Sequence, residues 1–206
     1  MKLYKEFWSW FKENQKDYYS FVPGDLEERD RLFHALSEQL SRVHQDLTFE
    51  FSPVFEDGHR EFVISAGGIR SAFPAVEALC SAAPTLPNWK ITAFRPRRQP
   101  LMPVRTHAVQ IEPRDVHYCL FRDGRKVGIM LFHKDYSEHR AEEYGNALFL
   151  LLDSALGEYD VETKVGFIEF YNIDNEFFRP DWVLPDLATH FDEVFAEIDG
   201  TEGCPS

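Results

Sequence analysis

Arginine is concentrated in one short, proline-rich segment of an otherwise acidic chain. Arg95, Arg97, Arg98 and Arg105 lie within residues 95–105. Planar guanidinium groups bind carboxylates and phosphates through paired hydrogen bonds, so these residues are candidates for an anion-binding site. The competing interpretation, which we favour, is that they pair with Asp and Glu of the same chain and hold its two halves together.

A glycine pair provides a second candidate for anion binding. Gly67 and Gly68 connect a predicted strand to a predicted helix, and backbone amides at such a junction can bind an anion. The segment has neither the lysine of a P-loop nor the G-x-G-x-x-G spacing. We therefore favour a flexible turn, while keeping both glycines with the four arginines in the candidate anion site.

The histidines and cysteines do not form a recognisable metal or nucleophile motif. His117 and Cys119 share a strand face, but two further zinc ligands are lacking and no neighbour lowers the pKa of the thiol. Cys80 lies on an apolar helix face and is expected in the core. We expect no metal site, no cofactor and no catalytic residue.

Composition restricts the classes of partner. Lys and Arg number 22 against 35 Asp and Glu, which gives a net charge of -13 and a pI near 5.0. Such a surface repels nucleic acid and anionic membranes and favours a basic protein partner. With no signal peptide evident at the N-terminus, no long apolar run and three cysteines without a CxxC pair, we expect a cytoplasmic protein.

The elements that position these residues are predicted to form an α+β fold in one domain, 1–206. Residues 47–96 and 116–172 each have the pattern of a ββαβ repeat, with a linker at 97–115. We expect the repeats either to stack or to join into one sheet, and to share a core. The sheet is expected to be mostly antiparallel, with helices on one side. A helical pair at 1–46 precedes them, and a C-terminal helix occupies 184–198.

Turn signals set the predicted register of both hairpins. A two-residue loop at Asp57–Gly58 places Phe51 opposite Ile64. A second one at Asp123–Gly124 places Tyr118 opposite Ile129.

Other local signals define the helices and the remaining strands. Asp25 is predicted to cap the second helix, and Ser71 and Ser137 to cap two later ones. The linker is expected to contain one strand, 106–111. A strand over 161–171 is expected to bulge at Gly166.

Three segments resemble a family of uncharacterised bacterial cytosolic proteins with no assigned activity. They are Phe7–Phe11 (FWSWF), Ala82–Trp89 (AAPTLPNW) and Ala93–Arg97 (AFRPR). The resemblance covers most of the chain. It implies a bacterial cytosolic origin and supplies no catalytic residues.

These observations favour a non-enzymatic binding or regulatory protein that acts on a basic protein partner, as an immunity protein neutralises a toxin. The alternative is an enzyme or small-anion-binding protein that uses an arginine-lined cleft between the repeats, with His107 or His117 as acid–base groups. A third hypothesis is a homodimer formed through Trp8, Trp10 and Phe11.

Overall fold

The computed structural model describes residues 2–22 and 24–200. Within them the fold is α+β, with six α-helices, mixed sheets and a helical pair at the N-terminus. Pro23, in the predicted break between the first two helices, and Cys204 lie outside the described residues. Contacts define two compact units, unit 1 (residues 1–95) and unit 2 (residues 96–206). The single domain stays a prediction.

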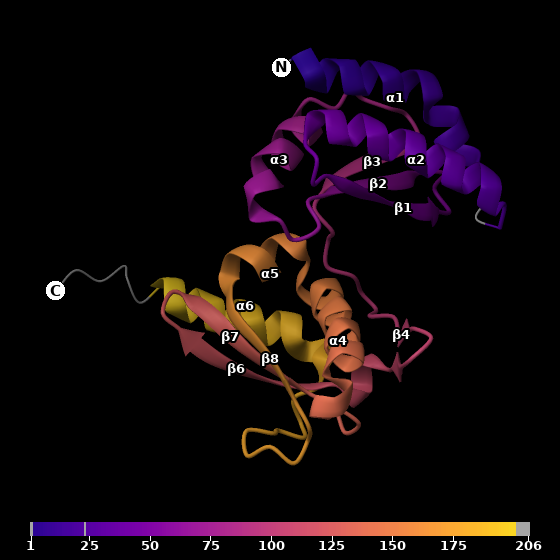
Figure 1. The fold of residues 1–206 in the computed structure, drawn as a ribbon. Helices are drawn as coiled ribbons and strands as arrows, with labels where there is room; N and C mark the ends of the chain where they lie inside the picture. Colours follow the sequence, from indigo (N-terminus) through magenta and orange to yellow (C-terminus); the bar gives the residue numbers. More distant parts are fainter. Residues whose placement is uncertain (1, 23, 201–206) are drawn as a thin grey trace. The chain divides into compact units, whose positions relative to one another are not determined.

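Unit 1 contains a three-stranded sheet and three helices (Figure 1). In chain order its elements are α1 (Lys2–Ser20), α2 (Leu26–Val43), β1 (Thr48–Val54), β2 (Arg60–Ser65), α3 (Phe73–Ser81) and β3 (Trp89–Ala93). The central strand β2 pairs antiparallel with β1 and parallel with β3. Every residue of β2 is buried.

Unit 2 has the same kind of sheet, preceded by a small hairpin. Its elements are β4 (Val104–Arg105), β5 (Gln110–Ile111), β6 (His117–Asp123), β7 (Lys126–Phe132), α4 (Ala141–Leu156), α5 (Glu158–Lys164), β8 (Val165–Tyr171) and α6 (Leu187–Gly200). Strand β7 is central, antiparallel to β6 and parallel to β8. The mostly antiparallel sheet that we predicted is therefore corrected to two mixed three-stranded sheets and one two-stranded sheet.

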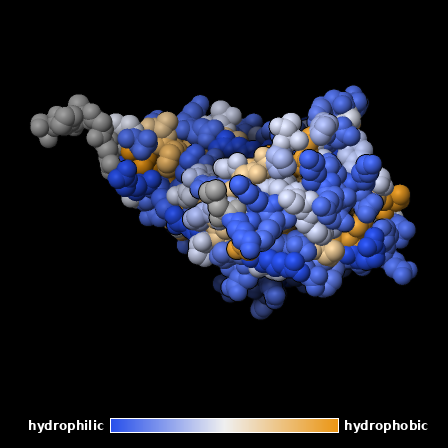
Figure 2. All heavy atoms as spheres, turned by 90° about the horizontal axis from the view of Figure 1, so that it is seen from above, coloured by the Kyte–Doolittle hydropathy of each residue, from blue (hydrophilic) through white to orange (hydrophobic). Residues whose placement is uncertain are grey.

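Each unit has its own cluster of buried apolar side chains. The core shared by the two repeats stays a prediction. In unit 1 the cluster is aromatic. Trp8 and Phe11 are buried in it, and the Trp8 indole donates a hydrogen bond to the Leu79 carbonyl oxygen at 2.8 Å. These two residues are therefore not available for the homodimer surface that we proposed from the sequence. On the face seen in Figure 2, hydrophilic residues predominate and hydrophobic ones form small separate patches.

The start of α2 agrees with its sequence signal. The Asp25 carboxylate accepts a hydrogen bond from the Glu28 amide at 3.1 Å, which satisfies one of the free donors of the first turn. The other two predicted caps are wrong. Ser71 lies inside a 3₁₀ turn before α3, and Ser137 precedes a 3₁₀ turn without forming a side-chain cap.

The register of the first hairpin differs from the prediction. Its loop has three residues, Glu56–Gly58, because the Phe55 amide donates to the His59 carbonyl oxygen at 2.7 Å. Gly58 adopts a φ of 77°, as the last position of such a loop requires. The three-residue loop moves the pairing by one residue, and an irregularity between Phe51 and Val54 moves it by one more. Phe51 therefore lies opposite Phe62, two residues from the predicted partner, and the same face stays buried.

The second hairpin is also shifted by two residues. Asp123 pairs with Lys126, so the loop is Gly124–Arg125 and Tyr118 lies opposite Leu131. Further along, the expected bulge at Gly166 is confirmed, because two residues of β8 lie between the partners of Val127 and Ile129.

Two shorter segments were predicted incorrectly. Residues 161–164 belong to helix α5 and not to a strand; acids in the first turn of α5 and Lys164 in its last turn complement the helix dipole. The linker contains the two-stranded β4–β5 hairpin instead of one strand over 106–111.

We predict that Gly128→Ala lowers the free energy of unfolding by about 1–3 kcal/mol. A methyl group on Gly128 would overlap the Phe167 ring, which lies over this central position of β7 at the bulge. Urea denaturation measures the loss. Gly200→Ala, at the end of α6 where nothing lies within 4 Å, is the matched control and should have little effect.

Candidate functional site

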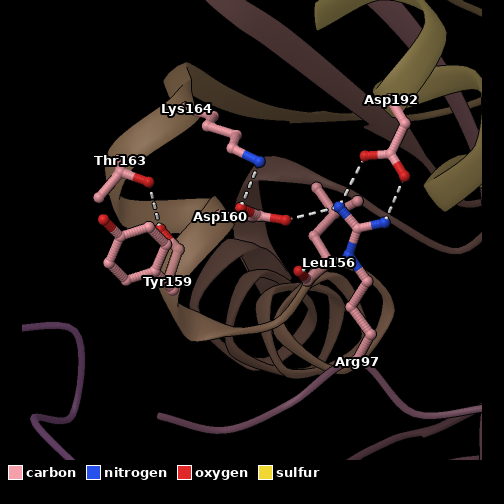
Figure 3. Close-up of polar contacts among 7 residues, drawn as sticks. All are labelled: Arg97, Leu156, Tyr159, Asp160, Thr163, Lys164 and Asp192. Carbon is pink, nitrogen blue, oxygen red and sulfur yellow. Dashed lines mark hydrogen bonds and ion pairs between the residues drawn. The ribbon is translucent and has the colours of Figure 1, made fainter. Parts of the chain in front are cut away.

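Arg97 is the centre of the largest polar network that involves a predicted site residue. Its Nε donates to the Leu156 carbonyl oxygen at 3.0 Å. Its terminal nitrogens donate to both oxygens of Asp192 at 2.7 and 2.8 Å and to Asp160 at 2.5 Å (Figure 3). Lys164 adds an ion pair to the other oxygen of Asp160 at 2.7 Å. We call these five residues the Arg97 network.

The elements of unit 2 explain why these groups meet. Leu156 is the last residue of α4, Asp160 and Lys164 lie one turn apart on α5, and Asp192 lies on α6. The Arg97 hydrogen bonds lower the pKa of Asp192, and the two carboxylates raise the pKa of Arg97. Four N–H groups of Arg97 thus donate hydrogen bonds within unit 2. This agrees with the interpretation that the arginines of this segment pair with Asp and Glu of the same chain.

Two of the other predicted arginines lie beside different carboxylates. Arg95 belongs to unit 1, where its Nε lies 3.1 Å from an oxygen of Glu50. Arg105 is exposed and lies 4.0 Å from Glu112. The backbone amide of Arg98 donates to the Ser154 carbonyl oxygen at 2.8 Å.

The glycine pair forms a turn with a hydrogen bond of its own. Gly67 and Gly68 have φ values of 59° and 81°, which explains the choice of glycine. The Gly67 amide donates to the Ser65 hydroxyl oxygen at 2.9 Å. This amide is consequently already occupied within the chain.

The candidate nucleophile and the two candidate acid–base histidines lie in different surroundings. Cys119 is buried, its thiol donates to the Phe177 carbonyl oxygen at 2.8 Å, and burial raises its pKa. His117 packs edge-on against Phe178, and His107 is exposed on the linker. Within residues 2–22 and 24–200, His, Cys, Asp and Glu form no group of three that could hold a metal ion.

The two faces of the unit 2 sheet have different neighbours. One face packs against α4 and α6, with Tyr118, Ile129 and Leu131 in the core. The opposite face carries Phe121, Met130, Phe167 and Tyr171, all partly exposed. Phe177, from the segment after β8, contacts Phe121 with ring centroids 5.6 Å apart and is 38% exposed. We call these five residues the outer sheet face.

Acidic residues accompany the outer sheet face. Glu169 lies opposite Met130, is exposed and accepts a hydrogen bond from the Tyr171 hydroxyl at 2.9 Å. Asp174 and Glu176 are exposed beside Phe177. Arg179, in the same segment, donates to the carbonyl oxygens of Glu176 and Phe178. The face thus combines aromatic rings with exposed carboxylates.

Sequence reasoning missed a hydrogen-bonded pair on the other side of this sheet, between a buried tyrosine and a partly buried histidine. The Tyr118 hydroxyl forms a short hydrogen bond with His190 Nδ1, and Trp182 packs against both rings. Burial raises the pKa of Tyr118, which keeps the phenol protonated. Tyr118 was predicted only as a core residue and His190 not at all, because β6 and α6 are far apart in the sequence.

We predict that Arg97→Ala lowers the free energy of unfolding by about 2 kcal/mol, because it leaves Asp160 and Asp192 without their main partner. Arg105→Ala is the matched control from the same segment and should change stability by less than about 0.5 kcal/mol. Urea denaturation of both variants provides the comparison. Equal stabilities would show that the Arg97 network does not stabilise the fold.

Buried His133 should make the protein acid-sensitive. Desolvation lowers the pKa of this histidine, and its Nδ1 accepts a hydrogen bond from the Asp135 amide at 3.2 Å. As pH falls below about 6.5, the unfolded chain takes up a proton that the folded chain resists, so stability decreases. His133→Asn keeps an acceptor for the amide and cannot titrate.

The decrease in unfolding free energy between pH 7.5 and 5.5 should therefore be smaller in His133→Asn by about 1 kcal/mol. Because the comparison uses the change in unfolding free energy between the two pH values within each protein, a lower absolute stability of the variant does not affect it. An unchanged pH dependence in His133→Asn would contradict the assignment.

In the part of the chain that the structure describes, no helix has both the length and the hydropathy to span a bilayer. Comparisons with protein-family models, curated proteins and solved structures gave no match. The resemblance to a bacterial family stays a prediction, and function has to be inferred from charge, exposure and geometry.

Proposed function

We propose that this is a non-enzymatic binding protein, and that the outer sheet face recognises a basic protein partner. The observation that carries the proposal is an exposed aromatic surface accompanied by carboxylates. Aromatic side chains supply much of the binding energy at protein interfaces. The exposed ring of Phe177, set against Phe121, is suited to that role.

The distribution of charge supports a basic partner. Unit 2 contains 21 of the 35 acidic residues and only 11 of the 22 basic ones. The number of unpaired basic side chains in unit 2 is smaller still, because Arg97 and Lys164 are paired with carboxylates. A net negative unit attracts a cationic protein at long range and accelerates association at low salt.

The alternative of an enzyme or anion-binding protein has less support. Arg97, the most highly coordinated of the predicted anion ligands, is engaged by Asp160 and Asp192. The raised pKa of Cys119 disfavours the thiolate that nucleophilic chemistry needs. We therefore keep protein recognition as the proposed function.

We also propose that residues 47–96 and 116–172 are two copies of one ββαβ unit. In both, a hairpin is followed by a helical crossover and a third strand parallel to the second one. The crossovers differ, because α3 is a single helix whereas α4 is followed by α5. This difference is compatible with divergence after duplication.

Affinity capture from the source cell, followed by mass spectrometry, tests the proposed function. The bait proteins are the wild type, the double variant Phe177→Ser/Glu169→Lys, and the control Met102→Ser, which removes an exposed apolar side chain outside the outer sheet face. We expect one basic protein to recur with the wild type and the control, and to bind the double variant about tenfold or more weakly. Its binding should weaken as salt is raised.

Two results would contradict the proposal. One is the absence of any recurring protein with the wild-type bait. The other is a recurring partner that the double variant retains at wild-type affinity, which would place the interface elsewhere on the chain.

A further inference from the structure

Unit 1 contains a cavity with a volume of about 440 Å³. Neither the Arg97 network nor the outer sheet face contributes residues to its lining. Residues from the C-terminal half of α1 and from the start of β3 line it: Gln15, Lys16, Tyr19, Ser20, Pro87, Asn88 and Trp89. The volume is within the range of small-molecule binding sites. From its lining we propose that the cavity binds a small planar aromatic carboxylate.

The walls of the cavity are aromatic and held in place. Trp89 is almost fully buried, and its ring packs against Phe11 and Phe51 on the core side. Tyr19 meets Trp89 edge to face, with ring centroids 6.0 Å apart, and its hydroxyl donates to the Gly58 carbonyl oxygen at 2.8 Å. Two fixed rings at a steep angle, with Pro87 beside them, suit a flat apolar ligand.

The polar groups of the lining select an anion. Among the described residues, Lys16 forms no ion pair, and the Asn88 amide forms no side-chain hydrogen bond. The Gln15 amide and the Ser20 hydroxyl donate back to carbonyl oxygens of α1. None of the residues that line the cavity carries a carboxylate.

Lys16 and Asn88 are both exposed, and their side-chain donors have no acceptor among the described residues. A carboxylate supplies that acceptor and neutralises the ammonium group, whereas a cationic ligand would be repelled. The aromatic ring of the same ligand would cover the walls. This binding site is independent of the outer sheet face, which belongs to unit 2.

Three probes that share an indole ring and differ in charge test the inference: indole-3-acetate, indole-3-acetamide and tryptamine. Isothermal titration of the full chain should give a Kd of about 1 mM or tighter for the acid. We expect the neutral amide to bind about tenfold more weakly and the amine more weakly still.

A pair of lysine variants locates the site. Lys16→Gln should reduce the affinity for the acid to that for the amide and leave amide binding unchanged. Lys12→Gln, one turn earlier on α1 and outside the cavity, should bind all three probes like the wild type. Three results would overturn the proposal: no binding of indole-3-acetate, equal affinities for acid and amide, or an unchanged affinity for the acid in Lys16→Gln.

Discussion

Both units depend on a central strand that pairs on both sides. Strands β2 and β7 each hold an antiparallel hairpin partner on one edge and a parallel strand on the other. The parallel partner requires a helical crossover, and that crossover packs on the sheet.

Arg60, at the first position of β2, is buried although its side chain is charged. Its guanidinium donates to the carbonyl oxygens of Tyr18 and Tyr19 at the end of α1, so it joins the helix to the sheet.

Arginine thus has a structural role in both units. Arg60 neutralises the C-terminal end of a helix dipole and stacks on Phe21, with 4.1 Å from its guanidinium carbon to the ring centroid. Arg97 connects the end of α4 to α5 and α6. Arg97 pairs with internal carboxylates, whereas Arg60 is held by backbone carbonyl oxygens and an aromatic ring. A basic side chain without an ion pair is therefore the more informative indication of a binding site, and Lys16 is an example.

The sequence predicted element types better than it predicted register. Periodicity identified α1, α2 and the hairpin strands, and Gly166 signalled the bulge. The register of the first hairpin depended on the length of the loop at Asp57–Gly58 and on the irregularity between Phe51 and Val54, and the identity of the loop dipeptide decides neither. The outer sheet face was not predicted, because Phe121, Phe167 and Phe177 come from three distant segments. The arginine segment was singled out from the sequence, but only the fold shows that Asp160 and Asp192 converge on Arg97.

The irregularities of the outer strands affect how the chain meets other chains. Pro53 lies within an irregular part of β1, and β8 bulges at Gly166. The start of β6 is covered by the segment around Val183. Strand edges that are bent or covered are poor templates for intermolecular strand addition and aggregation. For the binding protein that we propose, recognition at these strands would rest on side chains rather than on backbone edges, and the bent edges lower the tendency of the exposed aromatic residues to promote fibril growth.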